Sequence, residues 1–240
     1  MPSVKVNDIN VYYELSGADG NKSKIVLICG LGTNIAPYRN IMRMLSKEYR
    51  VLTFDNRGVG RTDKPNIPYT IEMMAEDTAG LLEALEFAPA NVIGFSMGGR
   101  ISMDLTLKHP EMVRSLILTS TSARVKDKRR RGTSWSFYKL VKRIRAIFGG
   151  QPYYAFIRQF RASVEYDCTE KLGEIKVPTL ILYGKKDNLV PADLVEEMRE
   201  KIKGSKIITF NGGHPFFFWQ VKAFTDAVLE FLAEVKGPSN

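Results

Sequence analysis

Ser96 lies in a G-x-S-x-G motif, which reads Gly94-Phe95-Ser96-Met97-Gly98 in this chain. A short strand-like run, 91–93, precedes the motif, and a helical pattern follows it over 97–108. A serine on a sharp strand-to-helix turn is exposed at the helix N-terminus, where unpaired backbone N–H groups can stabilise an oxyanion. Small flanking residues let the chain pass closely at such a turn. The motif in this setting predicts a serine nucleophile.

A serine nucleophile needs a base, and the chain has two histidines. His109 ends the helical segment that begins after Ser96, so about twelve residues, or roughly 18 Å, separate the two. We expect His109 to terminate that helix before Pro110. His214 follows the apolar run 207–210 and a glycine-containing loop. A packed loop histidine is the alternative, but its place at the carboxyl end of a strand favours His214 as the base.

An acid must orient the imidazole of such a base and balance its charge. Asp187 follows the apolar run 180–183, again where a strand is expected to end. The alternative is an ordinary surface acid. The chain order of Ser96, Asp187 and His214 is the order expected for a hydrolase with a nucleophile elbow. We therefore predict that these three residues form a catalytic triad.

Short apolar runs recur along the chain, at 25–28, 51–54, 91–93, 116–119, 180–183 and 207–210. Runs of this kind are typical of strands buried on both faces of a parallel sheet, and segments with helical spacing separate them. Residues 4–16 instead alternate apolar and polar side chains around Asn7-Asp8, which predicts an antiparallel hairpin. The predicted fold is α/β: a mostly parallel twisted sheet of about eight strands, with helices on both faces.

The segment 122–168 interrupts this alternation, because it contains no buried strand run. Its apolar residues recur at helical spacing on either side of Gly149-Gly150. We expect a small helical cap inserted into an α/β core made of residues 1–121 and 169–240.

The net charge of +9 is concentrated in this expected cap. Residues 124–145 contain ten Lys and Arg and one Asp, which leaves 25 basic and 25 acidic residues elsewhere. A solvated outer face of a cap helix is the favoured interpretation. Weak contact with an anionic membrane or lipid and steering of an acidic substrate are the alternatives, and nucleic-acid binding is not expected.

Composition sets the broad class of the protein. The 44% hydrophobic and 25% charged residues are ordinary for a soluble globular chain. Cys29 and Cys168 lie far apart and match no zinc or haem spacing, and neither histidine has a partner at ligand spacing. No apolar run approaches the 18 or so residues of a membrane span, and the N-terminus has no signal-peptide pattern. We expect a cytoplasmic protein with no metal and no cofactor, and leave the oligomeric state open.

The chain resembles the α/β-hydrolase fold superfamily of small esterases, lactonases and epoxide hydrolases. The resemblance covers nearly the whole length and includes these segments: Cys29-Gly30-Leu31-Gly32, 55–60, 94–99, His109-Pro110-Glu111, 177–187 and Gly213-His214. It implies that the backbone N–H groups of Leu31 and Met97 form the oxyanion hole, and that the cap covers the acyl pocket. The family usually has His-Gly on the first loop, where this chain has Cys29-Gly30.

The residue at the elbow selects among the activities of this superfamily. Dehalogenases and epoxide hydrolases of the family place Asp there, so Ser96 favours acyl-enzyme chemistry. The expected function is cleavage of a carboxylic ester of small to medium acyl size. An enol-lactone or carbon–carbon bond hydrolase is the alternative enzyme, and a non-catalytic ligand receptor on the same fold is the alternative from another class.

Overall fold

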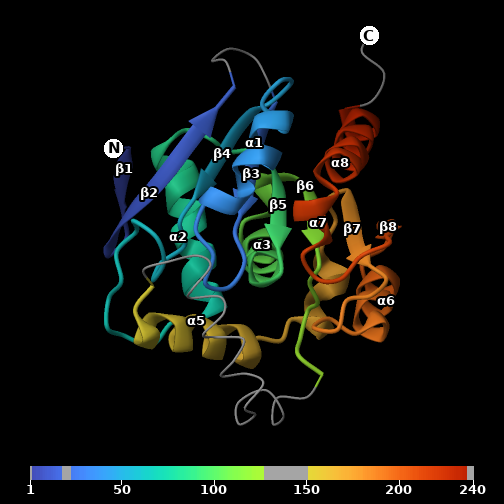
Figure 1. Cartoon of the computed structure of the whole chain (residues 1–240). Helices are drawn as coiled ribbons and strands as arrows, with labels where there is room; N and C mark the ends of the chain where they lie inside the picture. Colours follow the sequence, from blue (N-terminus) through green and yellow to red (C-terminus); the bar gives the residue numbers. More distant parts are fainter. Residues whose placement is uncertain (1, 18–22, 127–150, 237–240) are drawn as a thin grey trace.

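The computed structural model describes residues 2–17, 23–126 and 151–236. Its centre is a mixed sheet of eight strands in the order β1-β2-β4-β3-β5-β6-β7-β8 (Figure 1). The strands are β1 (Ser3–Val6), β2 (Ile9–Ser16), β3 (Lys24–Ile28), β4 (Arg50–Phe54), β5 (Ala90–Phe95), β6 (Val113–Thr119), β7 (Thr179–Gly184) and β8 (Lys206–Phe210). The predicted fold class, strand number and N-terminal hairpin are confirmed.

The pairing pattern follows the two kinds of sequence pattern. Strand β1 pairs with β2, and β2 with β4, in antiparallel register, whereas all other neighbours are parallel. Asn7 takes a positive φ of 51° in the hairpin turn. Strands β5 and β7 are buried along their whole length, as continuous apolar runs predict.

Helices cover both faces of the sheet. They are α1 (Arg39–Leu45), α2 (Ile71–Ala84), α3 (Met97–Lys108), α5 (Tyr153–Glu165), α6 (Ala192–Lys201), α7 (Phe216–Trp219) and α8 (Val221–Lys236), with short 3-10 turns at Ala36–Tyr38, Pro110–Met112 and Thr169–Glu174. Successive side chains of β3 enter different cores: Val26 and Ile28 pack into one cluster, and Ile25 and Leu27 into the other. This alternation buries the sheet between two apolar layers.

The described part of the expected cap contains one helix, α5, which crosses below the carboxyl ends of the parallel strands in Figure 1. Its inward side chains are fully or nearly fully buried: Ala155, Phe156, Gln159, Ala162 and Ser163. Residues 127–150 of the expected cap lie outside the described residues. The proposed boundaries at 122 and 168 therefore stay a prediction.

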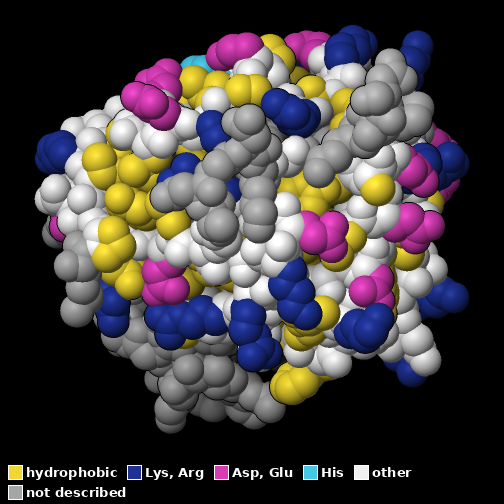
Figure 2. Space-filling model, turned by 90° about the horizontal axis from the view of Figure 1, so that it is seen from above, with side chains coloured by type: hydrophobic (Ala, Val, Ile, Leu, Met, Phe, Trp, Pro, Cys, Tyr) yellow, Lys and Arg dark blue, Asp and Glu magenta, His cyan; other side chains and the backbone are white. Residues whose placement is uncertain are grey.

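Two of the basic residues in 124–145 are described, and both are ion-paired with acids of α6. Arg124 pairs with Glu197 at 3.2 Å, and Lys126 pairs with Asp193. The other eight lie outside the described chain, so the predicted lipid contact stays a prediction. Elsewhere the charges are mixed: Figure 2 shows Lys and Arg interspersed with Asp and Glu on the face that lies uppermost in Figure 1. No helix within the described ranges is long and apolar enough to cross a membrane.

A buried ion pair fixes the loop that follows β4. The Arg57 side chain is 1% exposed and contacts Asp77 of α2 through Nε and Nη2, at 2.6 and 2.8 Å. Its Nη2 also contacts Asp8 of the N-terminal hairpin at 2.8 Å. One guanidinium thus joins the loop, the helix and the hairpin, in the bidentate geometry that arginine allows.

We expect Arg57→Leu to lower the free energy of unfolding by about 3 kcal/mol, because Asp77 would remain buried without its cation. Arg39→Leu is the matched control, since it removes an ion pair with Glu14 in which Arg39 is 56% exposed. That control is expected to cost less than about 1 kcal/mol. Urea unfolding followed by circular dichroism measures both, and equal losses in the two variants would contradict the account.

Candidate active site

Ser96 lies at the turn between β5 and α3 with φ 54° and ψ −112°. A non-glycine residue rarely adopts a positive φ, and surrounding contacts must hold it there. The Ser96 N–H donates to Thr119 O at 2.9 Å, and the Ser96 carbonyl accepts from Thr121 Oγ1 at 2.7 Å. Both partners belong to β6 or the residues just after it, so the neighbouring strand holds the turn in place.

The two motif glycines permit close backbone contacts that no side chain would allow. A Cβ on Gly98 would lie 2.1 Å from the carbonyl oxygen of Ile28, at the end of β3. A Cβ on Gly94 would lie 2.3 Å from Ser102 Oγ and 2.5 Å from the Gly98 carbonyl oxygen. Helix α3 can therefore start directly against β3 and β5, with Ser96 at its N-terminus.

The structure brings Ser96, His214 and Asp187 together in one chain of hydrogen bonds. His214 Nε2 lies 2.9 Å from Ser96 Oγ, and His214 Nδ1 lies 2.8 Å from Asp187 Oδ2. The Asp187 side chain has no exposure, and its other oxygen accepts from the N–H groups of Leu189 and Val190. The carboxylate is thus anchored by backbone donors and directed at the imidazole.

The loop that carries His214 is itself held on both sides. The carbonyl oxygen of His214 accepts a hydrogen bond from Ser120 Oγ at 2.7 Å. Gly184, at the end of β7, has no side chain to obstruct the loop: a Cβ there would meet the carbonyl oxygens of Gly212 and Gly213 at 2.6 and 2.7 Å. These contacts hold the loop that carries the imidazole at the ends of β6 and β7.

His109 lies elsewhere, as predicted from helix length. It caps the C-terminus of α3, and its Nε2 faces Glu76 at 3.1 Å. Ser96 stands at the N-terminal end of the same helix. The two histidines therefore occupy opposite ends of α3, and only His214 contacts the serine.

The loop after β3, residues 29–33, lies beside Ser96. A Cβ placed on Gly30 would be 3.6 Å from Ser96 Cβ. The Gly30 N–H donates to Tyr38 Oη at 3.0 Å, and the Gly32 N–H donates to Gln159 Oε1 at 3.1 Å. Between them, the Leu31 N–H makes no hydrogen bond within the described chain, and the same holds for Met97 N–H at the start of α3. Both groups are left available as donors.

Tyr38 and Gln159 belong to no sequence motif, and no pattern in the sequence points to either residue. Tyr38 is 8 residues from Gly30, and Gln159 is 127 residues from Gly32. Burial raises the pKa of Tyr38 above its ordinary value, so its hydroxyl stays protonated while it accepts from Gly30. Only the folded chain shows that these side chains hold the loop.

The side chain of Cys29, on the loop after β3, is fully buried. Its thiol contacts Thr53 Oγ1 and the Phe54 carbonyl oxygen. Burial, with the nearby charge of Asp55, raises its pKa well above the ordinary range. Burial likewise raises the pKa of Cys168 to about 11. Both thiols are protonated at neutral pH and are poor nucleophiles.

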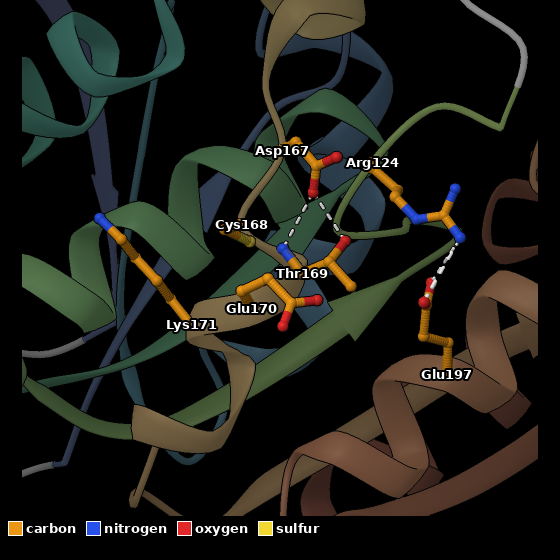
Figure 3. Close-up of a pocket in the computed structure, with 7 residues that line it drawn as sticks. All are labelled: Arg124, Asp167, Cys168, Thr169, Glu170, Lys171 and Glu197. Carbon is orange, nitrogen blue, oxygen red and sulfur yellow. Dashed lines mark hydrogen bonds and ion pairs between the residues drawn. The ribbon is translucent and has the colours of Figure 1, made fainter.

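A pocket of about 490 Å³ lies away from these residues, between the 3-10 turn Thr169–Glu174 and α6 (Figure 3). It is lined by Arg124, Asp167, Cys168, Thr169, Glu170, Lys171 and Glu197. Its polar groups are largely satisfied: Arg124 pairs with Glu197, and Asp167 accepts from the N–H and hydroxyl of Thr169. Ser96 and His214 are not among the lining residues, so we do not assign the substrate to this pocket.

The described residues hold no group of three or more His, Cys, Asp or Glu that could bind a metal ion.

Comparison with known families decides where the chain belongs. Residues 24–146, more than half of the chain, match the family described as "alpha/beta hydrolase fold". The chain belongs to the alpha/beta hydrolase family. Residues 88–217 of this hydrolase also match the family described as "Serine hydrolase (FSH1)", and that range includes Ser96, Asp187 and His214. The expected superfamily is therefore confirmed.

Individual relatives span almost the whole hydrolase. A protein named "Putative carbamate hydrolase RutD" from Azorhizobium caulinodans is 28% identical and covers 98% of this chain and 99% of its own. The human protein named "Serine hydrolase BPHL" is 26% identical, over 85% of this chain and 76% of its own. The crystal structure of the enol-lactonase from Burkholderia xenovorans LB400 superposes with a TM-score of 0.88 at 27% identity, covering 97% of this chain and 100% of that one.

We expect Gly98→Ala to lower the free energy of unfolding by about 2 kcal/mol, because the new methyl group must displace backbone at the end of β3. Gly173→Ala is the matched control, since the nearest atom to its Cβ would be 3.9 Å away. That control should leave stability unchanged or slightly raised. Urea unfolding of both variants measures the difference. A Gly98→Ala variant with the same free energy of unfolding as the unmodified protein would contradict the packing described for the elbow.

We also expect the native hydrolase to resist thiol reagents at pH 8, because both cysteines are buried and free. Titration with Ellman's reagent should release no rapid equivalent from the folded chain and two after unfolding in urea. A rapidly modified thiol in the folded protein would contradict the protonated, buried state assigned to Cys29 and Cys168.

Proposed function

We propose that this hydrolase cleaves a carboxylic ester of small to medium acyl size through an acyl-enzyme intermediate on Ser96. The observation that carries the proposal is the continuous line from Asp187 Oδ2 through the His214 imidazole to Ser96 Oγ, with separations of 2.8 and 2.9 Å. Hydroxyl, imidazole and carboxylate in this order are the parts that nucleophilic acyl transfer requires.

The first half of the reaction acylates the serine. Asp187 accepts the hydrogen bond of His214 Nδ1–H, which leaves the Nε2 lone pair directed at Ser96 Oγ. Nε2 takes the hydroxyl proton while Oγ forms a bond to the ester carbonyl carbon. The negative charge moves to the carbonyl oxygen of a tetrahedral intermediate. This intermediate collapses, His214 returns the proton to the leaving alcohol, and the acyl group stays on Ser96.

The second half releases the acid. A water molecule attacks the acyl carbon after giving its proton to His214 Nε2, and a second oxyanion forms. When the bond to Ser96 Oγ breaks, His214 gives the proton to that oxygen, and the carboxylic acid leaves. The serine, the imidazole and the carboxylate then return to their starting protonation states.

Both tetrahedral intermediates need donors for the oxyanion. We assign that role to the backbone N–H groups of Leu31 and Met97, which have no acceptor within the described chain. Met97 is the first residue of α3, so the helix dipole adds to its effect. Donors fixed in advance need no rearrangement as charge develops, which is the usual source of their rate contribution.

An enol-lactone is the second candidate substrate. The observation that favours it is the structural likeness to the Burkholderia enol-lactonase, at a TM-score of 0.88 over 97% of this chain. A lactone is a cyclic ester, so the same serine, base and oxyanion donors would open it. In that case the leaving oxygen would remain attached to the acyl group.

A series of p-nitrophenyl esters from acetate to laurate tests the proposal. We expect turnover that peaks at a short or medium chain, and loss of kcat/KM by at least about 1000-fold in Ser96→Ala and Asp187→Asn. An enol-lactone assayed in parallel ranks the second candidate. His109→Gln is the matched histidine control and should leave turnover unchanged, because His109 lies at the far end of α3. Full activity in Ser96→Ala would exclude the proposed mechanism.

A further inference from the structure

Gln159 of α5 connects the loops that follow two neighbouring strands. Its side chain is completely buried. Gln159 Oε1 accepts from the Gly32 N–H at 3.1 Å, and its Nε2 donates to the Arg57 carbonyl oxygen at 2.8 Å. Gly32 lies on the loop after β3, and Arg57 lies on the loop after β4. One side-chain amide thus satisfies a buried backbone donor and a buried backbone acceptor.

This contact is one of two that together hold Leu31 in place. The peptide before Leu31 is fixed through its carbonyl, since Gly30 O accepts from Thr33 Oγ1 at 2.9 Å and from Thr33 N at 3.3 Å. The peptide after Leu31 is fixed through the Gly32 N–H, which Gln159 accepts. The Leu31 N–H belongs to the first of these two planes. Gln159 holds the second plane, so the φ and ψ angles of Leu31 are restrained from both sides and the first plane cannot turn independently.

A second glutamine supports the first. Gln151 is 4% exposed, and its Nε2 donates to the same Gln159 Oε1 at 3.0 Å. The two donors from Gly32 and Gln151 occupy the acceptor capacity of the Gln159 carbonyl oxygen. The amide therefore has one orientation that satisfies its neighbours, with the carbonyl toward Gly32 and the amino group toward Arg57.

Helix α5 has other attachments that do not involve this loop. Arg100 of α3 donates to Ser163 through Nη1, to Oγ at 2.6 Å and to the carbonyl oxygen at 3.1 Å. At the other end of α5, the Tyr154 hydroxyl donates to the Lys64 carbonyl oxygen at 2.7 Å. These attachments do not depend on Gln159, so we expect the effect of changing this residue to be local to the loop.

We propose that Gln159 is a positioning residue that aims the Leu31 N–H at the oxyanion formed on Ser96. The expected cap thereby supplies part of the support of the oxyanion hole, through α5. This inference rests on the proposed roles of Ser96 and Leu31. A misdirected donor weakens binding of the transition state more than binding of the ester, so kcat should fall while KM changes little.

The test compares Gln159→Met with Ser163→Ala, which removes another buried polar side chain from the same helix without touching the loop. The first readout is the rate at which a fluorophosphonate modifies Ser96. In that reaction Oγ bonds to phosphorus, fluoride leaves, His214 takes the proton, and the phosphoryl oxygen needs the same donors. The second readout is kcat and KM for p-nitrophenyl butyrate.

We expect Gln159→Met to slow phosphonylation and lower kcat by about 10-fold, with KM within about twofold of the original value. Ser163→Ala should match the unmodified protein in both readouts. Gln159→Glu keeps an acceptor for the Gly32 N–H but loses the amide donor to Arg57. Its phosphonylation rate should therefore lie between the rates of Gln159→Met and Ser163→Ala. This variant also serves if Gln159→Met does not fold.

Equal rates in Gln159→Met and Ser163→Ala would overturn the inference, as would a loss confined to KM. Phosphonylation at Ser96 without turnover of any ester would refute the proposed ester substrate alone, and the Gln159 comparison would still be decided by the phosphonylation rates. Failure of the unmodified protein to react at Ser96 would overturn both, because no oxyanion would form there.

Discussion

The positive φ of Ser96 is the constraint on which the rest of the site depends. A non-glycine residue in such a backbone region costs on the order of 1–3 kcal/mol, and packing around it must provide the compensation. Thr119 and Thr121 hold the Ser96 peptide groups from the side of β6. The close approach of Gly98 to the end of β3 holds the start of α3 from the other side.

The parallel strands bring the other functional residues to the same edge of the sheet as Ser96. Strands β3, β5, β6, β7 and β8 are consecutive neighbours in the sheet and run in the same direction, so their carboxyl ends meet at one edge. Each of four loops at that edge carries one residue with a proposed role in the reaction. The loop after β3 carries Leu31, the turn after β5 carries Ser96, and the loops after β7 and β8 carry Asp187 and His214.

The sequence alone predicts those parts of this arrangement that depend on residues close together in the chain. The six apolar runs predict the six strands β3 to β8, and G-x-S-x-G predicts the elbow, because the needed glycines are within two residues of the serine. Its position at the end of a strand also distinguishes His214, the predicted base, from His109, which ends a helix. The residues that hold the loop after β3 could not be predicted in this way, since Gln159 and Gly32 meet only through tertiary packing. The same is true of the buried pair between Arg57 and Asp77, which joins a loop to a helix 20 residues away.

The most direct test of the central claim is to trap the acyl-enzyme. The hydrolase is mixed with a p-nitrophenyl ester, quenched in acid during turnover, digested and analysed by mass spectrometry. We expect a mass increase equal to the acyl group on the peptide that contains Ser96, and no such adduct in Ser96→Ala. Ester turnover with the acyl group on a different residue, or with no covalent adduct at any quench time, would contradict it.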